Sequence, residues 1–271
     1  MSSPTDTRVT SAVLTFRSII CGVDESSASH DAALQAALLA DEGAALTYVA
    51  VIWEQSVGAT GAIRDARDAL RRAQDDARAI GVDSAVVDEE SADPARRLLE
   101  IAGEHDLLVL AATRHSRARG IMDGSEATAA VHRSTVPVLI ARRPPEGVEF
   151  PARIVLASDG TPMSDAAAEL TARLAARHGS QVAIVGARDH EAPFRPGLAE
   201  HAAQIKEATG TEPLILEQAG PPHTGVRDAA REFRASLVVT GSRGLTGVSA
   251  LRSVSERIAH AAPCSVLVVR P

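Results

Sequence analysis

The chain repeats one pattern at the length of a protein domain. The segment SIICGVD at residues 18–24 corresponds to RIVLASD at 153–159, which lies 135 positions further on. Later, DLLVLA at 106–111 corresponds to ASLVVT at 235–240 with an offset of 129, and VLI at 138–140 to VLV at 266–268 with an offset of 128. A domain-length repeat predicts two similar folding units. The falling offset places a net deletion in the middle of the second copy.

The boundary between the copies lies in the proline- and glycine-bearing stretch at 142–147, RRPPEG. Such a stretch is typical of a loop, and 271 residues are enough for two domains of ordinary size. We therefore predict a flexible N-terminal segment over 1–16, a first domain over 17–143, a linker over 144–151 and a second domain over 152–271.

Each copy alternates short apolar runs with stretches of helical period. In the first copy, continuous apolar runs predict strands over 19–23, 46–52, 84–87, 107–111 and 136–141, as in a parallel sheet covered on both faces. Apolar positions from Ile63 to Ile80 step by three and four and predict a helix, and Asp93-Pro94 supplies the cap of another. The fold class is therefore α/β: two repeated, doubly wound domains, each a mainly parallel five-stranded sheet with helices on both faces.

Composition, charge and hydropathy argue against nucleic acid as a partner, a signal peptide and a membrane span. Aromatic residues make up 2% of the chain and the formal net charge is −7, which disfavours nucleic acid as a ligand. The N-terminus lacks the pattern of a signal peptide, and no apolar run is long enough to span a membrane. Cys21 and Cys264 lie in apolar runs and predict buried, reduced thiols. We expect a cytoplasmic protein.

Polar residues gather where strands are predicted to end. Asp24 and Asp159 each close the first strand of their copy, and ligands of doubly wound sheets bind at the carboxyl ends of the strands. Either aspartate could equally cap the helix that follows. After the fourth strand of the second copy comes GSRGLTG at 241–247, and then Ser253 and Ser255 at a predicted helix start. Glycine loops and helix N-termini favour phosphate.

These residues resemble the universal stress protein family in its tandem, two-domain form. The resemblance covers nearly the whole chain after Phe16 and is most specific at GSRG (241–244), SVSE (253–256) and APC (262–264). It implies an adenine nucleotide, ATP or a relative, with Mg only if ATP is bound. It also implies that the two copies pair as an internal pseudo-dimer, for which the last strands, 136–140 and 266–269, are the apolar edge candidates.

The resemblance carries the family's nucleotide site onto numbered positions of both copies. Around the adenosine it implies an aspartate and an apolar residue that end the first two strands. Around the ribose and phosphates it implies the glycine loop and the residues that follow it. In the second copy these are Asp159, Ala187, Gly241, Arg243, Gly244, Arg252, Ser253 and Ser255, and in the first copy Asp24, Val51, Gly124 and Ser125.

Both copies depart from the family motif, which has two glycines, nine residues, and then glycine with Ser or Thr. In the second copy seven residues separate Gly244 from Arg252-Ser253, so an arginine replaces a glycine. In the first copy ATRH at 112–115 replaces both early glycines, although Gly124-Ser125 follows. We therefore predict the nucleotide site in the second copy in preference to the first. The alternative is a protein that has lost nucleotide binding and acts only through contacts with other proteins.

Other chemistries have less support in the sequence. The nine histidines show no metal-ligand spacing and are predicted to lie at the surface or at helix ends; His115 stands in the motif loop. No nucleophile elbow is present, and Ser125 and Ser253 have no histidine nearby in sequence. We predict a non-enzymatic stress-response protein with an unidentified protein partner. A weak ATPase activity and a homo-oligomer stay open.

Overall fold

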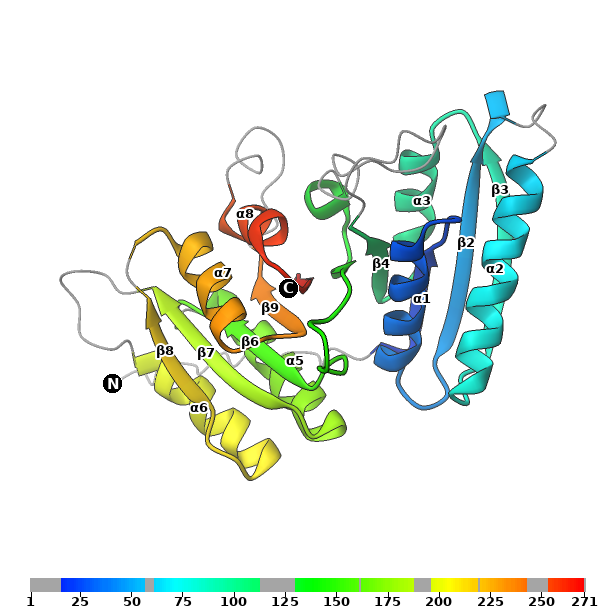
Figure 1. Cartoon of the computed structure of the whole chain (residues 1–271). Helices are drawn as coiled ribbons and strands as arrows, with labels where there is room; N and C mark the ends of the chain where they lie inside the picture. Colours follow the sequence, from blue (N-terminus) through cyan, green and yellow to red (C-terminus); the bar gives the residue numbers. More distant parts are fainter. Residues whose placement is uncertain are drawn as a thin grey trace, which may run out of the picture.

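The computed structural model describes residues 16–56, 61–112, 130–160, 162–187, 196–218, 220–242 and 253–270. Ten strands form one continuous sheet with helices on both faces (Figure 1). The strand order is β3-β2-β1-β4-β5-β10-β9-β6-β7-β8. Each repeat thus contributes five neighbouring strands.

The first repeat begins with β1 and ends with β5, and helical residues 130–133 precede β5. Its elements are β1 (Ser18–Gly22), α1 (Ser27–Leu39), β2 (Ala45–Trp53), the short 3-10 helix η1 (Glu54–Ser56), α2 (Ala62–Ala79), β3 (Ser84–Ser91), α3 (Pro94–Ala102), β4 (Leu107–Ala111) and β5 (Val138–Ala141).

The second repeat runs through the same series of elements. They are β6 (Arg153–Ala157), α5 (Pro162–His178), β7 (Gln181–Ala187), α6 (Pro196–Thr209), β8 (Leu214–Gln218), α7 (Pro222–Glu232), β9 (Leu237–Gly241), α8 (Val254–Ala261) and β10 (Ser265–Val269). Within each repeat the neighbouring strands pair in parallel. The prediction of two doubly wound α/β units is confirmed.

Strand residues point alternately into two cores. Ile19 and Cys21 belong to the core under α1, α2, α5 and α6, whereas Ile20 belongs to the core under α3, α7 and α8. Burial on both faces explains why the strands appear in the sequence as continuous apolar runs. The predicted helix cap at Asp93 is also confirmed, because its carboxylate accepts a hydrogen bond from the Arg96 N–H at 3.1 Å.

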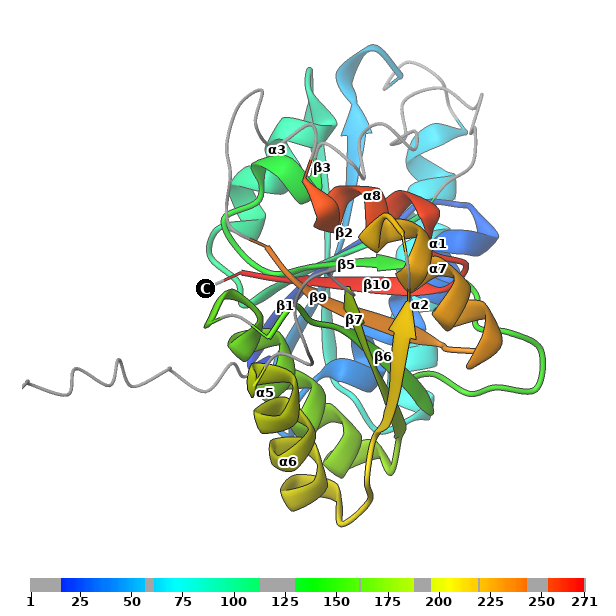
Figure 2. The ribbon, with the colours of Figure 1, turned by 90° about the vertical axis from the view of Figure 1, so that its left-hand side faces the viewer.

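The two repeats join through their last strands. β5 pairs with β10 in antiparallel fashion, with Leu139 opposite Leu267 and Ile140 opposite Val266; Figure 2 shows the two strands side by side at the centre of the sheet. This pairing is the internal pseudo-dimer that the sequence predicts. It covers the two strand edges that each repeat would otherwise expose.

Phe16, which the sequence places at the end of the N-terminal segment, is fully buried. Its N–H donates to Asp41 Oδ2 at 2.8 Å, and the Arg173 guanidinium of the second repeat lies 5.8 Å from its ring centroid. Phe16 therefore helps to join the repeats.

Both cysteines are buried and free, as predicted. Cys21 lies in β1, and Cys264 directly precedes β10. Burial raises the pKa of the Cys264 thiol to about 12 and raises that of Cys21 as well. Both side chains therefore behave as small apolar groups of the core.

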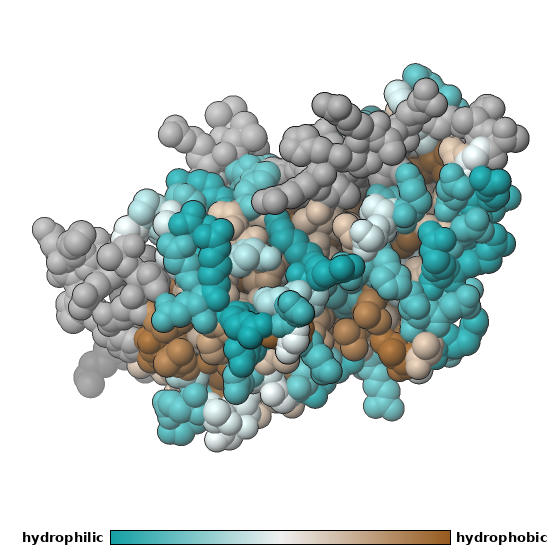
Figure 3. Space-filling view, viewed as in Figure 1, coloured by the Kyte–Doolittle hydropathy of each residue, from teal (hydrophilic) through white to brown (hydrophobic). Residues whose placement is uncertain are grey.

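The surface is largely polar, with apolar side chains at the two edges of the sheet. Val86 and Val87 of β3 and Leu214 and Ile215 of β8 are exposed, and Figure 3 shows the apolar surface over β8. Among the helices that the structure describes, none has the length and apolar composition required to cross a membrane.

Candidate functional site

A cavity of about 370 Å³ opens at the carboxyl ends of β6 and β9 in the second repeat. Its size falls within the roughly 300–1,000 Å³ of small-molecule sites. The four predicted site residues that it brings together are Asp159, Gly241, Ser253 and Ser255. They come from β9, from the start of α8 and from the loop after β6, as expected for a ligand site at the switch point of a doubly wound sheet.

One side of the cavity is built by the turn from β6 to α5. The strand ends at Ala157, and Gly160 adopts a positive φ of 67°, which favours glycine, before α5 begins. Asp159 is exposed between them, and Ser164 in the first turn of α5 donates to its Oδ1 at 3.3 Å. An exposed carboxylate held by a serine hydroxyl can accept hydrogen bonds from a ligand.

Another side is formed by the N-terminus of α8. Ser253 caps this helix, since its side chain accepts from the Glu256 N–H at 3.2 Å, and its Oγ lies 3.3 Å from Ser255 Oγ. Ser253, Val254 and Ser255 all line the cavity. The positive end of the helix dipole therefore lies at the cavity, where an anion is favoured.

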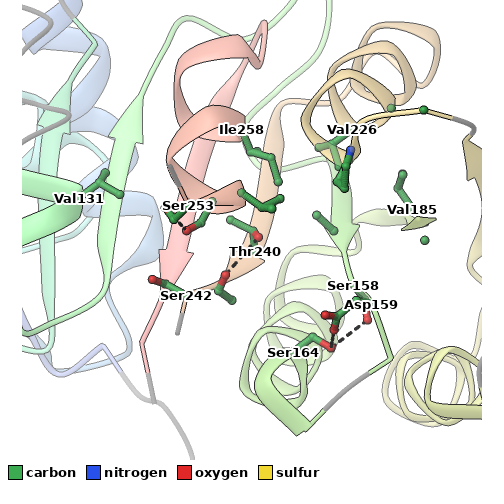
Figure 4. A pocket seen from close by; sticks show the side chains of 18 of the residues that line it. Val131, Ser158, Asp159, Ser164, Val185, Val226, Thr240, Ser242, Ser253 and Ile258 are labelled. Carbon is green, nitrogen blue, oxygen red and sulfur yellow. Dashed lines mark hydrogen bonds between the residues drawn. The ribbon is translucent and has the colours of Figure 1, made fainter. Parts of the chain in front are cut away.

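Apolar side chains also line the cavity. Val185 of β7, Val226 of α7 and Ile258 of α8 border it together with the polar Thr240 of β9 (Figure 4). Val226 and Ile258 are nearly inaccessible to solvent. The cavity therefore combines an exposed carboxylate, an apolar surface and a helix N-terminus.

The first repeat also contributes to this cavity. His132, from the helical residues before β5, lines it, and its Nε2 lies 2.8 Å from Glu256 Oε1. Both side chains are largely buried, with 13% and 9% of their surface exposed. The site of one repeat is thus completed by a residue of the other.

Nothing tests four predicted residues of the second repeat. Ala187 is the last residue of β7, the strand from which Val185 and Gly186 line the cavity, and its role stays a prediction. Arg243, Gly244 and Arg252 lie outside the described residues, so their roles stay predictions.

In the first repeat, Asp24 is engaged in the turn that starts α1. Its Oδ1 accepts from the Ser26 N–H at 2.8 Å, its own N–H donates to Ser29 Oγ at 2.8 Å, and Ser26 is the helix cap. Val51 packs against the core under α3. Gly124 and Ser125 lie outside the described residues.

The space corresponding to the cavity is more closely packed in the first repeat. A Cβ added to Gly22, the last residue of β1, would lie 3.0 Å from Leu98 Cδ2 in α3. If the proline that begins each helix is aligned, Leu98 corresponds to Val226 of α7, which lines the cavity. A larger side chain thus stands over the strand end in the first repeat.

Two histidines contradict the prediction that histidines lie at the surface or at helix ends. His201 in α6 is 5% exposed, and its Nδ1 lies 2.9 Å from the Oγ of Ser158, a cavity residue. His132 is the second. The sequence missed Ser158, His201 and His132 because their contacts cross long stretches of chain. The one local signal was a serine at 158, where the first copy has Val23. Across the described ranges, no three His, Cys, Asp or Glu residues group as a metal site.

Comparison with known proteins identifies the family. The profile of the Universal stress protein family matches residues 15–142 and again residues 152–270. A universal stress protein of Mycobacterium tuberculosis (strain H37Rv) is 30% identical over 195 residues, which are 65% of this chain and 66% of that protein. The match therefore spans just under two thirds of that relative's length.

Shorter and structural relatives agree with two copies of one domain. A universal stress protein of Thermus aquaticus is 32% identical over 133 residues, covering 97% of its own length but 43% of this chain. The crystal structure of a universal stress protein from Archaeoglobus fulgidus covers 95% of this chain and 98% of its own, with 20% identity and a TM-score of 0.75. That likeness shows the fold. The chain thus belongs to the universal stress protein family and carries the family's domain twice.

Proposed function

We propose that the cavity of the second repeat binds an adenine nucleotide, and that the protein responds to this ligand without turning it over. One observation carries the proposal: a single cavity is lined by the exposed Asp159, by the N-terminus of α8 and by apolar side chains. A nucleotide has matching parts, namely hydroxyl and amine donors, a flat base and an anionic phosphate.

The packing at the strand ends supports the second repeat, rather than the first, as the binding site. In the second repeat Asp159 faces a cavity that Ala157 and Val226 border, whereas in the first repeat Leu98 packs over Gly22. Mg²⁺ is expected only with a bound triphosphate. The cytoplasmic location and the protein partner stay predictions from the sequence.

Two measurements on the full chain test the proposal. With one Trp and one Tyr, the protein absorbs weakly at 280 nm, so co-purifying nucleotide is visible as excess absorbance near 260 nm. Calorimetric titration with ATP, ADP and AMP then gives the affinity. Flat titrations with all three, and no excess absorbance, would support the alternative of a protein that acts only through protein contacts.

A matched pair of variants tests which repeat binds. Asp159→Asn removes the charged acceptor in the second repeat, and Asp24→Asn makes the same change in the first. A hydrogen bond to a charged group contributes about 1.5–3 kcal/mol, or roughly ten- to a hundredfold in affinity. We expect a loss of this order in Asp159→Asn and unchanged affinity in Asp24→Asn. The reverse result would place the site in the first repeat.

A further inference from the structure

His201 is the centre of a hydrogen-bond chain that starts at the surface of the second repeat. Its Nε2 lies 3.0 Å from Asp165 Oδ1 in the first turn of α5, and its Nδ1 lies 2.9 Å from Ser158 Oγ. The Asp165 side chain is 64% exposed, whereas that of His201 is 5% exposed. The imidazole therefore lies between a solvent-exposed carboxylate and a buried hydroxyl.

Two serine hydroxyls continue the chain to the cavity. Ser158 Oγ lies 3.1 Å from Ser164 Oγ, and Ser164 in turn donates to Asp159 Oδ1 at 3.3 Å (Figure 4). Both serines are buried and both line the cavity. One imidazole and two hydroxyls thus connect Asp165 at the surface to Asp159 at the candidate ligand site.

The backbone holds these groups in place. A Cβ added to Gly197, in the first turn of α6, would lie 2.1 Å from the carbonyl oxygen of Gly160. The start of α6 therefore lies directly on the loop after β6. His201 follows one helical turn later on the same face, which brings its ring to Ser158.

The protonation state of His201 decides in which direction the groups of this chain donate their hydrogen bonds. When both ring nitrogens carry hydrogens, Nε2–H donates to Asp165 and Nδ1–H donates to Ser158. Ser158 can then donate to Ser164, and Ser164 to Asp159. Asp159 is then held as an ionised acceptor by the Ser164 hydroxyl.

Loss of the proton from His201 reverses the direction of the hydrogen bond between His201 and Ser158. With Nε2–H still donating to Asp165, Nδ1 becomes an acceptor and takes the hydroxyl hydrogen of Ser158. Ser158 then competes with Asp159 for the hydroxyl hydrogen of Ser164. The positive charge behind the cavity is lost as well.

We propose that His201 is a positioning residue for the ligand cavity, and that protonated His201 tightens the binding of a ligand that donates hydrogen bonds to Asp159. This inference rests on the proposed function, because it requires a nucleoside or nucleotide in the same cavity. Affinity should fall as the pH rises through the titration of His201. By linkage, the ligand should move that titration to higher pH.

Among the residues that the structure describes, the ionisable groups around His201 are acidic. On α5, Asp165 contacts the ring and Glu169 lies one turn further along the same face; Glu200 is its neighbour on α6, and Asp159 lies beyond the two serines. β7, the other element on which α6 packs, carries no ionisable side chain within its bounds. The described elements packed against His201 therefore bring only acidic groups near its ring.

The hydrogen-bond chain from Asp165 to Asp159 is specific to the second repeat. Val23 occupies the position of Ser158, so the first repeat lacks the hydroxyl that would connect a histidine to Asp24. Its own histidine pair, His30 with Asp76 at 3.1 Å, is on the surface, with 52% of the His30 side chain exposed. His30 is therefore a matched control.

Ser158 is better placed as a relay than as a nucleophile. Its Oγ accepts the Gly160 N–H at 3.0 Å in addition to its contacts with His201 and Ser164. The backbone N–H nearest to the hydroxyl is therefore used on the hydroxyl itself, and cannot stabilise an oxyanion formed beside it.

A first experiment needs no ligand. The ring signals of His201 are followed by NMR from about pH 5 to about pH 8, the range in which histidine titrates, and are assigned by their loss in His201→Gln. We expect Asp159→Asn to move the titration midpoint of His201 to lower pH, because the opposite charge at the end of the chain is gone. Ser158→Val should remove this effect of Asp159→Asn. An identical midpoint with and without the Asp159 charge would overturn the proposed coupling.

A second experiment measures Kd over the same pH range with adenosine and with cAMP, neither of which titrates there. We expect Kd to rise with pH, by about tenfold for each pH unit by which the ligand shifts the midpoint. The dependence should be absent in His201→Gln and Ser158→Val and intact in His30→Gln. Circular dichroism checks that each variant is folded.

The outcomes separate the two proposals. Binding that is independent of pH in the unmodified protein overturns the role of His201 and leaves the proposed function standing. A pH dependence that survives in His201→Gln and disappears in His132→Gln assigns the effect to His132 instead. If neither probe binds while the NMR coupling is present, the proposed function fails for these ligands and the chain from His201 to Asp159 stands.

Discussion

Arg142 and Arg270 join the two repeats by the same contact made in opposite directions. Arg142 follows β5 and its Nη2 donates to the carbonyl of Ala259 in α8 at 2.6 Å. Arg270 follows β10 and donates to the carbonyl of Val131 in the helical residues before β5. An offset of 128 separates the two arginines and also the two acceptors. The carboxyl end of the predicted first domain therefore holds an inter-repeat contact.

Removal of the Arg142 side chain should destabilise the whole protein. Its Nη1 also donates to the Cys264 carbonyl at 3.2 Å, and a buried acceptor that loses its donor costs about 1–3 kcal/mol. We expect Arg142→Ala to lower the free energy of unfolding in urea by this order. Arg143→Ala is the control, because the Arg143 side chain, which contacts Asp31, is 73% exposed. This variant should change the free energy of unfolding by no more than about 0.5 kcal/mol. Equal losses in the two variants would contradict this role of Arg142.

Val226→Leu should weaken ligand binding by reducing the cavity. The substitution gives the second repeat the residue of the first, where Leu98 packs over the strand end. We expect a higher Kd for AMP by calorimetry. The reverse change, Leu98→Val, removes a buried methylene and should cost about 1 kcal/mol of stability while Kd stays the same. A Kd that is unchanged in Val226→Leu would show that the ligand does not use this wall.

Gly197→Ala should be destabilising although alanine favours helices. The added Cβ would meet the Gly160 carbonyl at 2.1 Å, and overpacking of this kind costs about 1–3 kcal/mol. At Gly61, the position before α2, the nearest atom to an added Cβ lies 3.6 Å away, so Gly61→Ala should be tolerated. Thermal unfolding compares the two. A neutral Gly197→Ala would show that α6 does not lie so close to the loop.

Stability should fall as the pH decreases from about 7 to about 5. Burial lowers the pKa of His105 and of His178 below the ordinary value of 6.5. The unfolded chain therefore binds more protons than the native state in this range, and acid favours unfolding. Urea midpoints measured across the range test the slope, which should be shallower in a His105→Gln/His178→Gln variant. A slope of the same size in that variant would assign the effect to other groups.

Neither cysteine should react in the native protein at neutral pH. Burial raises the pKa of Cys264 to about 12, so the reactive thiolate is scarce and the reagent has no access. A colorimetric thiol reagent should detect neither thiol before denaturation and both thiols after it. Rapid labelling of the folded chain would indicate frequent opening of the strands that hold them.

Much of the candidate site could be predicted where a residue ends a strand or starts a helix. Asp159, Gly241, Ser253 and Ser255 were found in this way, because the carboxyl ends of parallel strands meet at one edge whatever the details of packing. Val185 and Gly186 of β7 also line the cavity and were not predicted, since the residues of a strand that face a cavity depend on where that strand ends.

The sequence by itself determined the two-domain α/β architecture, because hydrophobic periodicity and an internal repeat can be read from the order of the residues alone. The pairing of the last strands was implied by the resemblance to the universal stress protein family. Only the tertiary structure decided which side chains complete the cavity. His201 meets Ser158 across 43 positions, and His132 meets Glu256 from the other repeat. Such contacts depend on how the helices pack on the sheet. The position of a buried polar group is determined by its hydrogen-bond partner rather than by its neighbours in sequence.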